Sequence, residues 1–211
     1  MLNMKNSHES SQLLANAYAE FSIYKGLKFR ADYGHTNYKY ESSYFRPIIT
    51  QQDQSILGES PISTLTLWNG IYKTSTANFQ VDYKLDTGKH NINALLGYGT
   101  ERTRNVLTTL TYEGFPNDEV LNNVASAKWS SGQNQILQKH GLNSWFTRLN
   151  YGYFNKYFAE FSFRADASSK FGPNNQWGYF PAFSAAWVAS QENFFKHFRW
   201  LDNLKFRASI G

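Results

Sequence analysis

Hydrophobic and polar residues alternate one by one along several stretches of the chain. Residues 77–85 show this period of two clearly, with apolar side chains at odd positions and Asn78, Gln80, Asp82 and Lys84 between them. A β-strand points successive side chains to opposite faces of a sheet, so this alternation predicts a strand with one apolar and one polar face. Eight stretches share the pattern, namely residues 15–23, 27–33, 77–85, 92–98, 149–153, 159–165, 179–187 and 204–210. No long helix is predicted.

The connections between the predicted strands alternate between short and long. The tight turns are Lys25–Gly26, Asp86–His90 and Asn155–Lys156. Residues 41–72 and 100–143 are predicted to be long polar loops, residues 167–176 a medium loop on the same side, and residues 190–203 a connection with one helical turn on the short side. Long structureless loops are uncommon in compact soluble domains, whereas outer-membrane barrels have short periplasmic turns and long extracellular loops. The sequence therefore predicts an all-β, antiparallel, up-and-down transmembrane β-barrel segment of about eight strands.

Aromatic residues gather where the predicted strands reach the short turns. Tyr24 precedes the first turn, and Tyr151, Tyr153 and Tyr157 surround the third. In a membrane barrel these rings would form a girdle at the headgroup level. Aromatic residues also favour strands and pair across any sheet, but their clustering at strand ends favours the girdle.

The girdle interpretation assigns a direction to each face of the predicted strands. The lipid-facing residues would be Phe29, Phe79, Val81, Phe161, Phe163 and Trp187. The lumen-facing charged residues would be Lys28, Arg30, Asp32, Asp82, Lys84, Glu160, Arg164, Asp166, Lys205 and Arg207. In a soluble barrel the two faces would be exchanged, and the alternation by itself does not choose between these arrangements.

Composition excludes several other classes of protein. The 211 residues include no Cys, which excludes disulfides and thiolate sites, and the net charge of +5 contains no block of like charges typical of a nucleic-acid-binding arm. Aromatic residues make up 18% of the chain, which is unlike a disordered sequence. The longest uncharged stretch, residues 171–191, includes Pro173 and Pro181, so it does not predict a transmembrane helix. Residues 1–12 lack the apolar core of a secretory signal.

The sequence contains no motif of an enzyme, a cofactor site or a metal site. The five histidines are scattered, and no nucleophile elbow, phosphate-binding loop or calcium loop occurs. We therefore predict neither catalytic residues nor cofactors. Aromatic rings in the predicted long loops could instead stack on a sugar or a peptide, although such rings could equally hold the loops together. These candidate ligand contacts are Tyr44, Phe45, Trp68, Tyr72 and Trp129.

Residues 148–211 carry more specific motifs. They include Asn155-Lys-Tyr157, the run from Trp200 to Leu204, and a central motif formed by Asp166, Ser168, Ser169, Lys170, Phe171, Gly172, Trp177, Gly178, Tyr179, Phe180 and Pro181. This region resembles the late barrel region of the SusC/RagA family of TonB-dependent outer-membrane transporters. Two positions differ, because Ala167 stands where the family usually has Gly and Ile210 where it commonly has an aromatic residue. We expect Ala167 to restrict the predicted loop, since Ala adopts positive φ at a cost that Gly avoids.

The resemblance implies a barrel of about 22 strands around a plug. Residues 1–211 would be a fragment of that barrel, without plug, TonB box or signal peptide. It further implies import of large nutrients such as glycans or peptides across the outer membrane of a Gram-negative, Bacteroidetes-type cell. The implied partners are a SusD-like surface lipoprotein, TonB–ExbB–ExbD through parts absent from this chain, and outer-membrane lipid. A small eight-stranded outer-membrane barrel with a structural or adhesive role is the first alternative, and a soluble ligand-binding barrel is the second.

Overall fold

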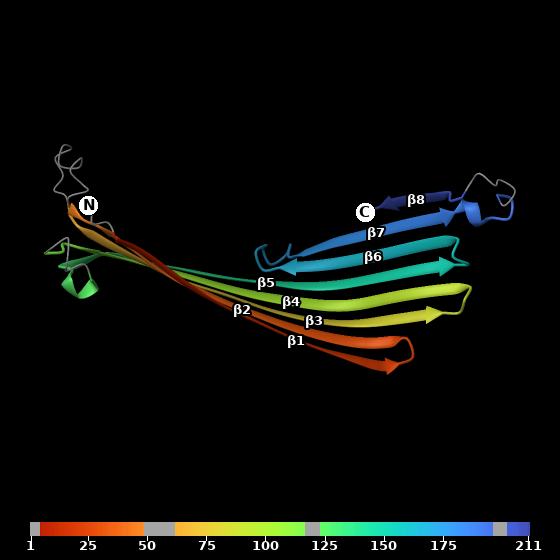
Figure 1. The fold of residues 1–211 in the computed structure, drawn as a ribbon, viewed down its shortest axis with the longest axis horizontal. Coiled ribbons are helices and arrows are strands. Elements are labelled where there is room, and N and C mark those ends of the chain that lie inside the picture. Colours follow the sequence, from red (N-terminus) through yellow and green to blue (C-terminus); the bar gives the residue numbers. More distant parts are fainter. Residues whose placement is uncertain (1–4, 49–61, 117–122, 196–201) are drawn as a thin grey trace. The chain divides into compact units, whose positions relative to one another are not determined.

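The computed structural model describes residues 5–48, 62–116, 123–195 and 202–211. Its eight strands form one sheet in which each strand pairs with the next in chain order (Figure 1). The strands are β1 (Lys5–Tyr24), β2 (Leu27–Arg46), β3 (Thr64–Asp86), β4 (His90–Glu113), β5 (Trp129–Tyr153), β6 (Tyr157–Ser168), β7 (Trp177–Val188) and β8 (Lys205–Ile210). Two 3₁₀ turns, η2 (Val124–Ser126) and η3 (Ala189–Gln191), lie in connections. The predicted all-β, up-and-down architecture of eight strands is confirmed.

The chain divides into two compact units. Unit 1 comprises Met1–Ala15, His35–Thr74 and Thr103–Lys139, and unit 2 comprises Asn16–Gly34, Ser75–Arg102 and His140–Gly211. Unit 2 contains the strand ends that the short turns join, and unit 1 contains the opposite ends of β1 to β5. The described residues include no helix long and apolar enough to cross a membrane.

The predicted tight turns are confirmed, and their backbone conformations explain them. Gly26, between β1 and β2, has φ +80° and its carbonyl accepts the Lys84 amide of β3 at 2.7 Å. Phe154 and Asn155, between β5 and β6, have φ 51° and 56°. Two successive positive φ values match the twist of the flanking strands in a two-residue turn.

The prediction of long polar loops is wrong for most of the described residues within 41–72 and 100–143. Strand β2 continues to Arg46, β3 begins at Thr64, β4 continues to Glu113 and β5 begins at Trp129. Residues 49–61 and 117–122 lie outside the described residues. The error has a physical cause, because the hydrogen bonds of the ladder are made by the backbone and persist where side chains on both faces are polar. Strand β1 likewise begins at Lys5, ten residues before the alternating stretch 15–23.

Unit 1 has a small apolar core. Phe45, Leu65 and Phe115 are buried there, with the Phe45 and Phe115 rings 5.3 Å apart in an edge-to-face arrangement. The Phe115 amide donates to the buried Ser63 hydroxyl at 3.1 Å, so the residues after β4 are held against those before β3. This core stabilises the strand ends that the sequence pattern had assigned to loops.

Candidate functional site: a sheet with two chemically different faces

The register of β5 to β8 separates apolar and polar residues onto opposite faces of unit 2. Phe161 of β6 lies opposite Leu149 of β5 and Phe183 of β7, and Phe183 lies opposite Ile210 of β8. Directly paired residues share a face, so the pairs define an apolar face. Its members in these strands are Trp145, Leu149, Tyr151, Tyr153, Tyr157, Phe161, Phe163, Trp177, Tyr179, Phe183, Trp187, Phe206 and Ile210.

The apolar face is open to the surroundings. Phe161 is 43% exposed, Phe183 50% and Tyr179 63%. A contiguous exposed apolar surface of this kind is characteristic of an interface with lipid or protein. The sheet therefore requires an apolar environment on this side.

Tryptophans mark both ends of the apolar face on β7. Trp177 and Trp187 are the first and the eleventh residues of this strand and lie on the same face. At ~3.3 Å per residue they lie about 33 Å apart along the strand, or about 25 Å apart across a bilayer for a strand tilted by ~40°. The apolar band of an outer-membrane barrel has this height, and its aromatic girdles lie at these two levels. At the short-turn end, Trp187 stacks on Phe206 with ring centroids 5.8 Å apart.

The opposite face of unit 2 carries the charged residues. In β6, the Arg164 Nε donates to both carboxylate oxygens of Asp166 at 2.9 and 2.8 Å. In β2, Arg30 binds Asp32 in the same way, with a shortest distance of 2.7 Å. Each pair is two residues apart on one strand, which places both members on the same face. These residues, with Glu20, Lys28, Asp82, Lys84, Asn150, Glu160 and Ser184, form the polar face.

A hollow of about 400 Å³ lies on the polar face. Asn91 and Asn93 of β4, Asn150 of β5, Glu160 of β6 and Ser184 of β7 contribute its polar lining. Asn93 donates to Asn91 at 2.8 Å, so part of the hydrogen-bonding capacity is satisfied within the wall. Such a lining suits contact with water, a polar solute or a plug.

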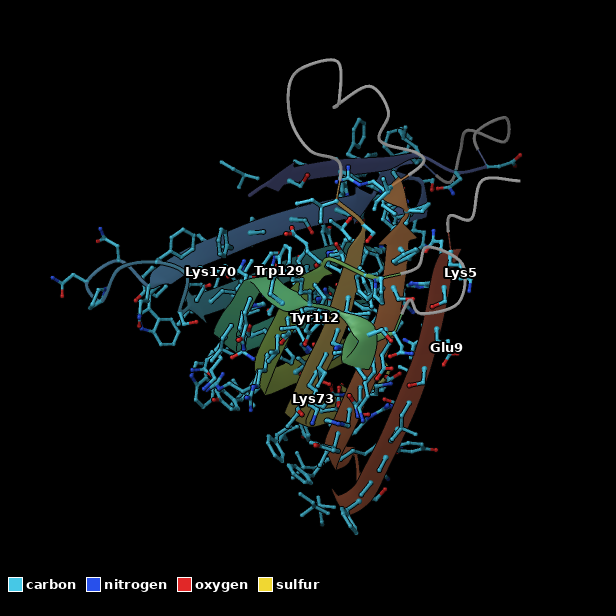
Figure 2. The ribbon with its side chains drawn as sticks, turned by 90° about the vertical axis from the view of Figure 1, so that its left-hand side faces the viewer. Lys5, Glu9, Lys73, Tyr112, Trp129 and Lys170 are labelled. Atoms are coloured by element: carbon cyan, nitrogen blue, oxygen red, sulfur yellow. The ribbon has the colours of Figure 1, made fainter. Side chains whose placement is uncertain are left out.

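The structure corrects the placement of the five candidate ligand contacts, all of which lie in strands. Tyr44 and Phe45 belong to β2, Trp68 and Tyr72 to β3, and Trp129 begins β5. Phe45 is 1% exposed in the core of unit 1, so its ring is not accessible to a ligand in this conformation. Trp129, labelled in Figure 2, donates its indole Nε1 proton to Glu113 at 3.1 Å.

Trp68 and Tyr72 belong to an aromatic arrangement that the sequence reasoning missed. The Tyr40 ring of β2 lies directly on Gly70, the residue midway between Trp68 and Tyr72 on β3. Residues two positions apart share a face, so Trp68 and Tyr72 flank the covering ring. Tyr40 also lies 6.0 Å from Tyr38 and 6.1 Å from His8, measured between ring centroids. The spacing Trp68-x-Gly70-x-Tyr72 was the available signal, because Gly leaves room for a ring from the neighbouring strand.

The central motif of the resemblance lies at the β6–β7 connection. Ser169 and Gly141 exchange two hydrogen bonds, with the Ser169 hydroxyl accepting the Gly141 amide at 2.8 Å and the Ser169 amide donating to the Gly141 carbonyl at 3.0 Å. Ala167 is buried within β6 opposite Asn143 and Trp177. The expected restriction of a loop by Ala167 is therefore wrong, because this residue is in extended backbone.

A carboxylate organises the short-turn end of β6 and β7. Glu192, just after η3, accepts the Tyr157 hydroxyl at 2.7 Å and the Lys156 ammonium at 3.1 Å. The Trp187 indole adds a third, longer contact of 3.4 Å. The hydrogen bond from Tyr157, followed by that from Lys156, lowers the pKa of Glu192 below its ordinary value of 4.5. We call these four residues the Glu192 cluster.

Among the described residues, no group of three or more His, Asp or Glu side chains is arranged to hold a metal ion.

The sequence matches no family model. It is, however, similar to several curated proteins. TonB-dependent receptor P3 of Formosa agariphila is 29% identical over 93% of this chain and 19% of its own length, and receptor P39 of that organism is 29% identical over 100% and 20%. TonB-dependent receptor SusC of Bacteroides thetaiotaomicron is 39% identical over 37% of this chain and 8% of its own length.

Solved structures share the fold. The RagAB peptide transporter matches with a TM-score of 0.83 and 24% identity over 98% of this chain and 23% of that chain. This chain resembles part of a SusC/RagA-type TonB-dependent receptor. The resemblance found in the motifs is thus confirmed, and it extends to the first half of the chain, where no motif had been found. The SusC/RagA-like segment spans about a fifth of the length of the curated relatives P3 and P39.

Proposed function

We propose that this SusC/RagA-like segment forms part of the barrel wall of an outer-membrane transporter that imports large nutrients. The observation that carries the proposal is the apolar face of unit 2, which is exposed and ends in Trp177 and Trp187 at the spacing of a bilayer's apolar band. In this arrangement the apolar face contacts lipid and the polar face lines the lumen. The segment supplies the wall of a transport path and no catalytic group.

The complete transporter would close a barrel of about 22 strands around a plug. A SusD-like surface lipoprotein would cover its mouth, and TonB–ExbB–ExbD would supply energy through parts outside this chain. The similarity to the TonB-dependent receptor SusC and to the RagAB peptide transporter supports these partners and a peptide substrate. A glycan is the other substrate class that the family resemblance implies. Trp68 and Tyr72 are the rings we propose as substrate contacts, because they lie exposed or half-buried beside the Tyr40 ring.

A pair of adjacent substitutions tests the facing of the wall in the full-length receptor. Phe161 belongs to the apolar face, whereas Ser162 lies opposite Arg148 on the other side of the sheet. Arg at the bilayer midplane on a lipid face costs roughly 2–4 kcal/mol, so Phe161→Arg should reduce the amount of heat-modifiable barrel in outer membranes, as measured by gel mobility with and without boiling. Ser162→Arg should leave that amount near the wild-type level. Equal amounts in the two variants would refute the assignment.

A closed eight-stranded barrel is less well supported. The sheet order begins at β1 and ends at β8, without a β1–β8 pairing among the residues that the structure describes. A barrel closes by pairing its first and last strands, which satisfies the backbone groups of both edges. The open order therefore favours a segment of a larger barrel.

A further inference from the structure

A polar cluster borders the apolar face of unit 2 at the end remote from the short turns. The Asn143 side-chain oxygen accepts three hydrogen bonds, from the Tyr98 hydroxyl at 3.2 Å, the Thr100 hydroxyl at 2.9 Å and the Arg102 Nη1 at 3.1 Å. Tyr98 also packs on Trp145, with ring centroids 4.8 Å apart. Trp145 belongs to the apolar face, so the cluster lies on that same side of the sheet.

The register fixes the level of this cluster along the strands. Asn143 lies opposite Ala167, and Ala167 lies opposite Trp177. Trp177 marks the end of the apolar band that is remote from the short turns, and short turns face the periplasm in outer-membrane barrels. In the proposed orientation the cluster therefore lies toward the outer leaflet, at the end of the apolar face that Trp177 marks.

Two cationic residues lie close in the structure to Gly141, one by direct contact of its side chain and the other as the neighbour of Ser169 in the chain. Gly141 is two residues from Asn143 on the same face. The Arg102 guanidinium lies against Gly141, where an added Cβ would be 2.8 Å from Nη1. Lys170 follows Ser169, which exchanges two hydrogen bonds with Gly141. Arg102 and Lys170 are both exposed, and Figure 2 labels Lys170 in the β6–β7 connection.

Neither cation has a carboxylate partner within the described part of the chain. The ion pairs found there include neither Arg102 nor Lys170. The hydrogen bonds of Arg102 to Glu101, Leu142 and Asn143 all use Nη1. They fix the plane of the guanidinium while Nε and Nη2 stay available for a bidentate contact, the geometry that phosphate favours.

We propose that Arg102 and Lys170 form a membrane-facing site for the phosphate group of an anionic outer-leaflet lipid. This inference rests on the proposed function, because it requires the apolar face to contact lipid. Cations at the membrane boundary recognise anionic headgroups, and the adjacent apolar face would hold the acyl chains. Asn143 acts as a positioning residue that orients the guanidinium toward the headgroup.

The test measures lipid retention by the full-length receptor that contains this segment. Purified receptor in a neutral detergent is titrated with bisphosphorylated lipid A and examined by native mass spectrometry. Changing both Arg102→Gln and Lys170→Gln should lower the apparent affinity by about tenfold, because charge-assisted hydrogen bonds to the phosphate are lost. Lys170→Gln alone, at an exposed position, should lower it by several-fold. The control is Arg148→Gln, which removes one charge from the polar face and should leave retention unchanged.

Lipid chemistry gives a second, independent readout. Lipid A without phosphates should bind the wild-type receptor about as weakly as bisphosphorylated lipid A binds the double variant, and millimolar inorganic phosphate should compete poorly because it lacks acyl chains. Equal retention of bisphosphorylated lipid A by wild-type and double-variant receptor would overturn the lipid site. If Phe161→Arg and Ser162→Arg also behave alike, the facing of the wall is wrong. If only Phe161→Arg impairs assembly, the wall proposal stands and the lipid site alone fails.

Discussion

Gly26 and Gly88 adopt nearly the same backbone conformation in two short turns, with φ of +80° and +78°. Their surroundings differ. A Cβ at Gly26 would collide with the carbonyl oxygen of Lys84, whereas a Cβ at Gly88 meets no described atom within 4 Å. The positive φ alone costs a non-glycine residue about 1–2 kcal/mol.

We predict that Gly26→Ala lowers the stability of the receptor by clearly more than Gly88→Ala does. Gly88→Ala should cost only the ~1–2 kcal/mol of the backbone conformation, while Gly26→Ala adds displacement of β3 from the turn. The temperature at which the barrel loses its folded gel mobility measures the stability of both variants. Similar shifts for the two variants would show that the Gly26–Lys84 approach is not needed for the turn.

Two of the rings considered as ligand contacts differ in burial, so substituting each one distinguishes a role in packing from a role in binding. These rings are Phe45 and Tyr72. Phe45→Ala should destabilise the receptor by about 3–5 kcal/mol, because it removes a buried ring that packs on Phe115. Tyr72 is 41% exposed, and Tyr72→Ala should change stability by less than about 0.5 kcal/mol. The temperature at which each variant loses its folded gel mobility measures the difference in stability. A large loss of stability with Tyr72→Ala would assign that ring to packing as well.

At the scale of elements, alternation predicted the order of the strands and their ends at the short turns, but not their lengths. In β3 the pattern identified residues 77–85, while the strand begins at Thr64. Strict alternation arises where one face of a strand is apolar and the other polar, so the signal is present only where the two faces differ in this way. In unit 1, residues such as Phe45 are buried within the protein, and their pattern is set by local packing. Pairing across strands, such as Tyr40 on Gly70, cannot be predicted without the register.

The Glu192 cluster joins the β5–β6 turn, through Lys156, to β6 and to the residues after β7. The pKa of Glu192 in the folded protein is below its ordinary value of 4.5, first because of the Tyr157 hydroxyl and then because of Lys156. A group with a lowered pKa stabilises the fold above its ordinary value, and that stabilisation is lost as the pH falls through the folded-state value.

We therefore predict that stability falls on acidification below about pH 4.5 more steeply in the wild type than in Glu192→Gln, because Gln has no charge to lose. Thermal denaturation of the full-length receptor at several pH values between 3 and 7 measures the difference. Glu160→Gln is the control, since the exposed Glu160 lies 4.0 Å from Arg148. Parallel pH profiles for wild type and Glu192→Gln would exclude a stabilising role for the ionised carboxylate.

At the scale of the whole molecule, the sheet depends on surroundings that the chain does not itself provide. Every residue of β1 and β8 is exposed, including Phe21 at 60% and Ile210 at 77%. A strand with an unpaired edge and an exposed apolar face pairs or aggregates unless another strand or lipid covers it. The apolar face also exposes Phe183 and Tyr179, which need the same cover.

We predict that the isolated 211-residue chain forms no heat-modifiable, monodisperse species in detergent, whereas the full-length receptor does. The physical reason is that β1 and β8 lack the neighbouring strands whose hydrogen bonds would satisfy their edges in the membrane. Gel mobility with and without boiling, together with size-exclusion chromatography, compares the two proteins prepared in the same detergent. A folded, monomeric isolated chain would contradict the proposed place of this segment in a larger barrel and would favour an eight-stranded barrel that closes by itself.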